Sequence, residues 1–271
     1  MLNRLKNLVV ATLLSVVITG CAATTGPTKG FTPGAIPQTN VPSQASIAQT
    51  RKVIIQELGQ KQGMALSTSG ADYQRVNNLV RRLSRAAGLG NFSYPVIIAS
   101  AGKQVNAMAV NGNTIVVYKE LLRRVPNDTQ LAAVVGHEIS HILNHHHEDN
   151  TAQNRAVGVK IGAGILGSII GGRMGADTGK LAENIAGTLG QGYFVNSYSR
   201  EMEYEADHTG MLLMAKAEYN AQGAIQFWSH ASQIFGTPSG GSDFLSTHPS
   251  GDRRLARLQA ALPKARQYYG H

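Results

Sequence analysis

The chain has 271 residues, a single cysteine and a formal net charge of +9. This length supports one substantial hydrophobic core, and 42% hydrophobic with 15% charged residues argues against a disordered or polytopic membrane protein. One cysteine excludes an intramolecular disulfide, and the scattered lysines and arginines lack the aromatic-flanked basic stretches of RNA-binding motifs, so no nucleic-acid partner is expected.

Residues 1–20 predict a lipoprotein signal peptide. Arg4 and Lys6 precede an apolar run at residues 8–18, the order found in export signals. That run is too short for a permanent spanning helix, which needs about 20 apolar residues. The following Ile18-Thr19-Gly20-Cys21 resembles a lipobox, in which small residues let the processing peptidase reach a lipid-carrying cysteine. A conventional signal peptide or an N-terminal anchor helix is the alternative.

Cys21 is therefore the expected lipidation site and membrane anchor. Cleavage before it removes Arg4 and Lys6 and lowers the net charge from +9 to +7. Ala22, rather than an aspartate, follows the cysteine, which favours the outer membrane of the bacterial envelope. We expect the mature protein to be anchored to that membrane and to face the periplasm.

Residues 21–46 are expected to form a disordered tether, and residues 47–271 a single folded domain. The tether consists of Ala, Thr, Gly, Pro and Ser with almost no large apolar residue, so it cannot bury enough surface to fold. Two helical patterns follow at residues 47–58 and 73–83. In the second, apolar residues recur at spacings of three and four, and the pattern closes near Gly88.

Three strands are predicted at residues 95–99, 104–110 and 114–118. Asn111-Gly112 between the last two favours a type I′ turn, because both central positions of that turn need positive φ. The chain is then expected to enter a long helix after Pro126. The Asn127 side chain can cap this helix, and the residue three positions later is a glutamine, which completes a capping box.

This long helix carries His137-Glu138-Ile139-Ser140-His141, an H-E-x-x-H motif. Residues four apart share one face of a helix, so His137 and His141 can both bind one zinc ion. Glu138 flanks that position, where it can take a proton from the attacking water and pass it to the leaving amine of a peptide.

The motif helix is expected to continue through His145, His146 and His147. One interpretation is a second metal site, because His145 lies one further helical turn beyond His141. A solvated helix end is favoured, since positive charge is stabilised near a helix C-terminus.

A Gly-rich, mostly apolar stretch follows at residues 156–192. Its glycines weaken a helix in water and Lys160 interrupts the apolar run, so a flexible lid is favoured over a buried helix pair or a membrane-contacting segment. Helices are predicted beyond it on either side of a Gly/Ser-rich loop at 236–242, at residues 197–219, 224–234 and 252–261.

A catalytic zinc usually has three protein ligands, so a third is expected from another element. The helix from Ser199 to Asp207 offers Glu201, Glu203 and Glu205. Spacing alone leaves the choice open, because both Glu201/Glu205 and Glu203/Asp207 lie one turn apart.

The H-E-x-x-H motif followed about 60 residues later by S-R-x-x-E-x-E-A-D resembles the HtpX-like zinc metallopeptidases, which are related to the CAAX-prenyl proteases and include BepA- and LoiP-like envelope peptidases. The resemblance runs from about residue 47 to the end. It includes Val105-Asn106-Ala107 and a His248-Pro249 step with Arg254 six residues after His248. It implies an α+β, mostly helical zincin-like domain with a small β-sheet and the H-E-x-x-H active-site helix.

The same resemblance implies roles for the acidic helix. Glu203 becomes the third ligand of one zinc ion per chain, and Asp207 orients a ligand histidine. Glu201 and Glu205 are then expected to face solvent or to form salt bridges. The strand at 104–110 is expected to expose a sheet edge to an extended substrate, with an ordinary core hairpin as the alternative.

His248 allows two interpretations. In one it is simply the entry to the last helix. In the other it visits the fourth zinc position and displaces water, so that the site is latent until a substrate or partner moves the loop.

The expected function is a zinc-dependent metalloendopeptidase that hydrolyses peptide bonds in misfolded or unassembled envelope polypeptides. A zinc-dependent chaperone or assembly factor with a latent peptidase site is the first alternative, and a structural lipoprotein without metal is the second. An integral-membrane prenyl-peptide protease is disfavoured, because the sequence shows no convincing set of membrane spans.

Overall fold

The computed structural model describes residues 32–148, 198–235, 245, 248 and 251–269. The predicted signal peptide, Cys21 and the Gly-rich stretch at 156–192 lie outside them. Among these residues no helix has the length and apolar character needed to cross a bilayer. The elements follow one another in the order α1 (Gln44–Ile54), the π-helical η1 (Ile55–Lys61), β1 (Ala65–Ser67), α2 (Gly70–Ala86), β2 (Val96–Ser100), β3 (Ala107–Val110), β4 (Thr114–Tyr118), α3 (Lys119–Arg124), α4 (Asp128–Leu143), α7 (Arg200–Lys216), α8 (Gln222–Ser229), α9 (Ala231–Phe235) and α11 (Asp252–Arg266).

The sheet has the order β1-β2-β4-β3, with β2 and β4 parallel and the other pairs antiparallel. The predicted strand at 114–118 is confirmed, and β3 is shorter than expected. Asn111 and Gly112 have φ values of 49° and 63°, and the Asn113 N–H donates to the Val110 carbonyl, which confirms the predicted turn. β1 was not predicted, since a strand of three residues carries too little pattern.

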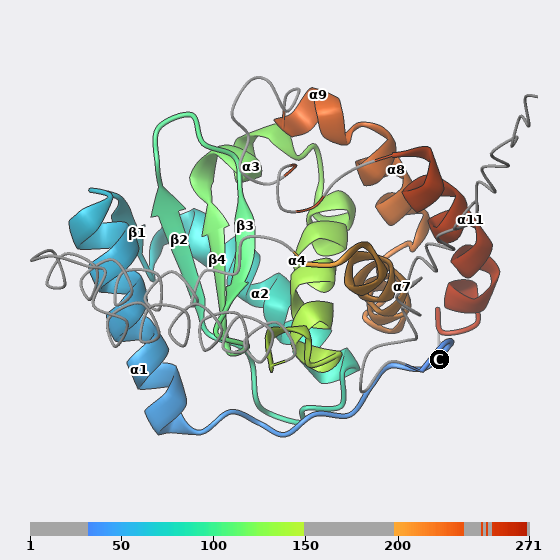
Figure 1. Cartoon of the computed structure of the whole chain (residues 1–271), viewed down its shortest axis with the longest axis horizontal. Coiled ribbons are helices and arrows are strands. Elements are labelled where there is room, and N and C mark those ends of the chain that lie inside the picture. The colour runs from blue at the N-terminus through green and yellow to red at the C-terminus, as the bar shows by residue number, and fades with distance from the viewer. Residues whose placement is uncertain (1–31, 149–197, 236–244, 246–247, 249–250, 270–271) are drawn as a thin grey trace, which may run out of the picture.

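Both faces of the sheet are buried, as alternate residues of β4 show. Ile115 and Val117 belong to the larger core with α2 and α4, whereas Val116 and Tyr118 face a second core with Ile54 of α1. In Figure 1 the sheet therefore lies between α1 and the central helix α4. This packing fixes β3, at the edge of the sheet, beside α4.

α4 carries the H-E-x-x-H motif through the centre of the molecule, with the sheet on one side and α7, α8 and α11 on the other (Figure 1). The Asn127 side chain accepts a hydrogen bond from the Gln130 N–H at 2.9 Å, which confirms the predicted cap. Every residue from Leu131 to Leu143 is buried. A helix with so little exposed surface holds its motif rigidly.

α4 and α7 cross in close contact at Gly136 and Gly210. A Cβ atom on Gly210 would lie 3.1 Å from both the Gly136 carbonyl carbon and the His137 nitrogen, which are backbone atoms, whereas one on Gly136 would lie 3.4 Å from the Gly210 oxygen. The two glycines therefore let the helix that carries the motif approach the helix that carries the acidic residues.

We expect Gly210→Ala to destabilise the protein by about 1–3 kcal/mol, because backbone must shift to make room. Gly136→Ala is the matched control. A Cβ atom there meets a looser contact, and its small cost is offset by a gain in helix propensity of about 1 kcal/mol. Urea unfolding of the zinc-saturated variants measures both effects. Equal stability of the two variants would contradict this account of the crossing.

Residues 21–46 were expected to form the tether, yet the segment at 32–43 packs onto the folded body and residues 44–46 begin α1. Ile36 packs against the larger core, and the Tyr268 hydroxyl donates to the Gly34 carbonyl at 2.9 Å. Ile36 supplies the apolar side chain that allows this short segment to bind the surface.

The later helices differ from their predicted bounds at two places. The predicted helix at 224–234 is interrupted at His230, which separates α8 from α9. The last helix does not end near residue 261 but continues past Pro263 to Arg266, where Ala265 is fully buried. Packing of this last turn outweighs the hydrogen bond that proline cannot donate.

Candidate metal centre

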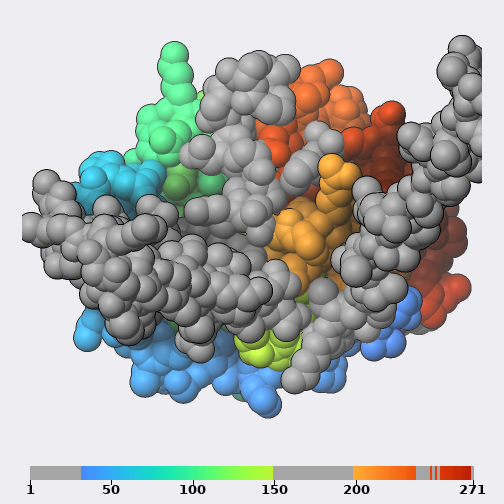
Figure 2. All heavy atoms as spheres, viewed as in Figure 1, coloured from blue at the N-terminus to red at the C-terminus, as the bar shows by residue number. Residues whose placement is uncertain are grey.

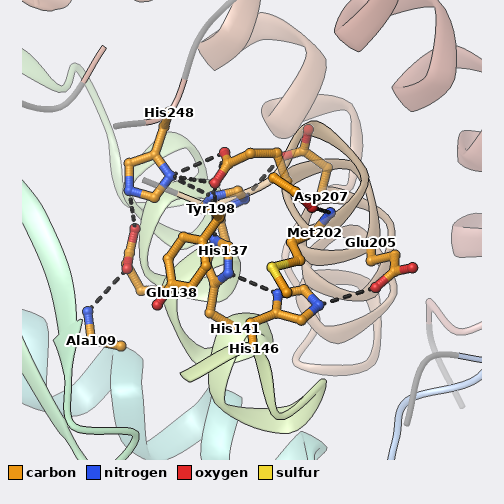
Figure 3. Close-up of polar contacts among 12 residues, drawn as sticks. Ala109, His137, Glu138, His141, His146, Tyr198, Met202, Glu205, Asp207 and His248 are labelled. Atoms are coloured by element: carbon orange, nitrogen blue, oxygen red, sulfur yellow. Dashed lines mark hydrogen bonds and ion pairs between the residues drawn. The ribbon is translucent and has the colours of Figure 1, made fainter. Parts of the chain in front are cut away.

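Four buried side chains converge between α4, α7 and the segment before α11. His137 and His141 come from α4, Glu203 from α7, and His248 from that segment, and each offers a ligand atom within 4.8 Å of the others. The Nε2 atoms of His137 and His141 lie 3.1 Å apart, and each lies 3.4 Å from a Glu203 oxygen. Figure 3 shows His248 reaching this group from a segment separate from α4.

Glu203 owes its position to the start of α7. The Ser199 side chain caps the helix by accepting a hydrogen bond from the Met202 N–H at 3.2 Å, so Glu203 lies in the first turn. In the space-filling view the orange start of α7 reaches the surface between the green elements of the sheet region and the red α11 (Figure 2). Glu203 itself is buried within that first turn.

Asp207 lies one turn after Glu203 and contacts His137. Its Oδ1 lies 2.9 Å from His137 Nδ1, on the side of the imidazole away from the converging atoms. Arg254 donates to both Asp207 oxygens and lies 3.3 Å from a Glu203 oxygen. The guanidinium also stacks on Trp228, 3.2 Å from the ring centroid. Arg254 and Trp228 thus fix the carboxylates around His137, a role that the sequence alone did not assign.

The electrostatics of this group favour a cation. Burial lowers the pKa of the His137 imidazole, but the Glu203 and Asp207 carboxylates outweigh it and raise that pKa to about 9. Burial also raises the pKa of Glu203, yet His248 and His137 hold it well below its usual range. The carboxylates of Glu203 and Asp207 share the buried Arg254 guanidinium and the His137 imidazole, and Glu138 is buried beside them. A divalent cation would therefore take the place of the His137 proton in balancing this negative charge.

Glu138 lies beside the converging atoms, between α4 and the edge strand. Its Oε2 accepts a hydrogen bond from the Ala109 N–H at 3.0 Å. Its Oε1 lies 3.5 Å from His248 Nε2 and has no hydrogen-bond partner among the described residues. Burial raises the pKa of this carboxyl, although His248 and His137 oppose the shift. A raised pKa suits a group that accepts and returns a proton near neutral pH.

The prediction of a solvated helix end at His145–His147 is wrong, and these residues do not extend the helix. α4 ends at Leu143, and His146 and His147 are buried. His146 Nδ1 lies 2.8 Å from His141 Nδ1. Burial lowers the pKa of His147 to about 3, so this imidazole is neutral. The break after α4 therefore places His146 against the motif instead of in solvent.

Tyr198 covers the other side of His141. Its ring stacks on the imidazole, with centroids 3.7 Å apart and planes 16° from parallel, and its hydroxyl lies 3.1 Å from His147 Nε2. Burial and the nearby carboxylates raise the pKa of this phenol, so it stays protonated. The His141 ring is therefore held by stacking on Tyr198 and by its contact with His146.

The remaining glutamates of α7 differ from each other. Glu201 pairs with Arg257 at 3.0 Å at the surface, as expected of a residue left to salt bridges. Glu205 is buried and lies 3.1 Å from His146 Nε2. Glu205 is thus bound to the surroundings of the site and not to solvent.

A profile of peptidase family M48 matches residues 71–262, well over half of the chain. The chain belongs to peptidase family M48. It is 30% identical over 168 residues to mitochondrial metalloendopeptidase OMA1 of Saccharomyces cerevisiae, covering 60% of this chain and 45% of that relative. It is 27% identical over 265 residues to the beta-barrel assembly-enhancing protease of Escherichia coli, covering 94% and 52%. The chain spans about half the length of these relatives.

The M48 match confirms the HtpX-like resemblance and the assignment to the metalloprotease class of enzymes. The mostly helical fold with a small mixed sheet and the H-E-x-x-H helix is also confirmed. The identity of the ion and the roles of the individual side chains stay predictions.

Proposed function

We propose that this M48 chain is a zinc-dependent endopeptidase of the bacterial envelope. The observation that carries the proposal is the convergence of His137, His141 and Glu203 with a buried glutamate, Glu138, beside them. Two imidazoles and one carboxylate are the donor set of many catalytic zinc sites, and their charge suits a divalent ion. When bound, zinc polarises a carbonyl and activates water for attack.

The residues around this ion transfer the proton and hold the ligands in position. Glu138 takes the proton of the attacking water and passes it to the leaving amine, and its raised pKa assists the return of the proton. Asp207 keeps a proton on His137 Nδ1, which leaves Nε2 free to act as a ligand. Arg254 holds Asp207 and Glu203 in place through its buried guanidinium.

The edge strand β3 binds an extended substrate through backbone hydrogen bonds. The Tyr118 N–H donates to the Asn106 carbonyl, so the backbone groups of Ala107 and Ala109 face away from β4. The Ala107 N–H donates to the Asn106 side chain, and the outward carbonyls are the groups offered to a substrate. The Ala109 N–H meets Glu138, so this edge lies within hydrogen-bond reach of the proposed base. Backbone pairing along β3 selects little between side chains, which suits misfolded or unassembled envelope polypeptides as substrates.

Metal removal tests the proposal. Treating the full chain with a chelator should reduce cleavage of an unfolded protein such as casein to background, and adding back one equivalent of zinc should restore it. Metal analysis of each sample accompanies the assay. Cleavage that survives complete removal of the metal would contradict a zinc peptidase, and a chain that takes up no zinc would favour a structural lipoprotein.

His248 is proposed to gate the site. Its Nδ1 lies 3.0 Å from both Glu203 oxygens and 3.2 Å from His137 Nε2, among the candidate ligand atoms. If it occupies the fourth position in most molecules, His248→Ala should increase peptidase activity, and a tenfold increase corresponds to a closed population of about 90%. Unchanged activity together with an unchanged spectrum of the cobalt-substituted protein would remove the gating role.

Membrane attachment through lipidated Cys21, with the catalytic domain facing the periplasm from the outer membrane, completes the proposal. It is supported by the sequence at residues 18–22 and by the likeness to the beta-barrel assembly-enhancing protease. Incorporation of labelled palmitate into the wild type but not into Cys21→Ala tests it.

A further inference from the structure

The end of α4 brings a third histidine back to the H-E-x-x-H motif. On a continuing helix, a residue five positions after His141 would lie about 140° around the axis from it. α4 instead ends at Leu143, and His145 adopts a φ of 59°. This left-handed residue breaks the helix before a new helical turn at residues 146–148, and His146 lies against His141. The position of His146 thus depends on where the helix stops.

His146 bridges His141 and Glu205. Its Nδ1 lies 2.8 Å from His141 Nδ1, and its Nε2 lies 3.1 Å from Glu205 Oε2. Figure 3 shows these three side chains in a row that runs from the motif to α7. All three are buried, so the contacts are shielded from water.

Only one arrangement of protons lets this row support metal binding. His141 must present an unprotonated Nε2 to the ion, so its proton lies on Nδ1 and is donated to His146 Nδ1. The remaining His146 proton then lies on Nε2 and is donated to Glu205. Both imidazoles are neutral in this arrangement, and each hydrogen bond has one donor and one acceptor.

We propose that His146 and Glu205 are positioning residues that fix the tautomer and orientation of His141 as a metal ligand. The inference rests on the proposed zinc site and adds a carboxylate that orients its second histidine, as Asp207 orients the first. His137 contacts the Asp207 carboxylate directly, whereas His141 reaches a carboxylate through one intervening imidazole. Both carboxylates come from α7, the helix that also supplies Glu203.

Zinc affinity of purified full-length variants, measured by competition with a chromophoric chelator, tests the proposal. His146→Leu should weaken zinc binding about 10- to 100-fold, the usual effect of losing such a support. His146→Gln should recover most of the affinity, because an amide offers one acceptor and one donor. His145→Asn is the matched control, since His145 is partly exposed and asparagine tolerates its positive φ.

A double-variant cycle separates positioning from general packing. Glu205→Gln should weaken zinc binding in the wild type but have no further effect in the His146→Leu background, because the row is already broken. An equal loss in both backgrounds, or an affinity of His146→Leu equal to that of the wild type, would overturn the proposal.

Nitrogen NMR of the zinc-loaded wild type gives a test that needs no variant to fold. The expected spectrum has a proton on His146 Nε2 and none on its Nδ1, and the opposite tautomer would overturn the proposal. Zinc binding that depends on His146 in a chain that cleaves no substrate would refute the peptidase and leave the positioning role intact. Cleavage by the wild type together with an unchanged zinc affinity in His146→Leu would support the peptidase and refute the positioning role.

Discussion

Glu138→Gln should reduce peptidase activity by about 10²- to 10⁴-fold while leaving zinc bound. The substituted amide keeps an oxygen that can accept the hydrogen bond of the Ala109 N–H, so the packing between α4 and β3 is retained. It cannot take a proton from water, and the loss equals the contribution of general acid and base catalysis. Steady-state cleavage of an unfolded substrate, with zinc content measured on the same samples, gives the result.

The same variant separates a peptidase from a chaperone. If the chain works as an assembly factor with a latent peptidase site, Glu138→Gln should preserve its function in the envelope although cleavage is lost. Glu148→Gln is a suitable control, because Glu148 is exposed and pairs only with its neighbour His145 among the contacts of the described residues. Full cleavage activity in Glu138→Gln would show that another group supplies the base.

Local sequence patterns predicted the half of the site that lies on one helix. The cap at Asn127, the apolar face and the spacing of His137 and His141 are properties of α4 alone, and all of them are present. Such patterns need no knowledge of tertiary structure, because helix geometry determines which residues share a face.

The spacing of residues along α7 could not identify the third candidate ligand. Glu201, Glu203 and Glu205 all lie within two turns of α7, and only the rotation of α7 against α4 distinguishes them. The close crossing at Gly136 and Gly210 sets that rotation. The resemblance to a known family favoured Glu203, whose oxygens lie 3.4 Å from the Nε2 atoms of both histidines.

The residues that support the site were missed because their positions depend on a break in the helix and on distant elements. His146 follows His141 at a spacing of five, which a helical interpretation places on another face. The asparagine at position 144 and the positive φ at His145 mark the end of the helix, and asparagine near a helix end is a signal that the sequence does contain. Trp228 and Arg254 meet only after α8 and α11 pack together.

Glu203→Gln should weaken zinc binding by more than about 100-fold. The carboxylate lies within 3.4 Å of both Nε2 atoms of the motif histidines, and an amide is a poorer ligand that also lacks the negative charge. The substitution is nearly isosteric, and Arg254 keeps its hydrogen bonds to Asp207, so the fold should persist. Chelator competition measures the affinity, and circular dichroism of the zinc-free protein checks the fold.

Glu201→Gln provides the matched control on the same helix. Glu201 lies half a turn from Glu203, carries the same charge and forms a surface ion pair with Arg257, which typically contributes less than about 1 kcal/mol. Its loss should leave zinc affinity unchanged. If both variants bound zinc like the wild type, Glu203 would not be a ligand. If both lost affinity equally, the effect would reflect the net charge of α7 and not coordination by one carboxylate.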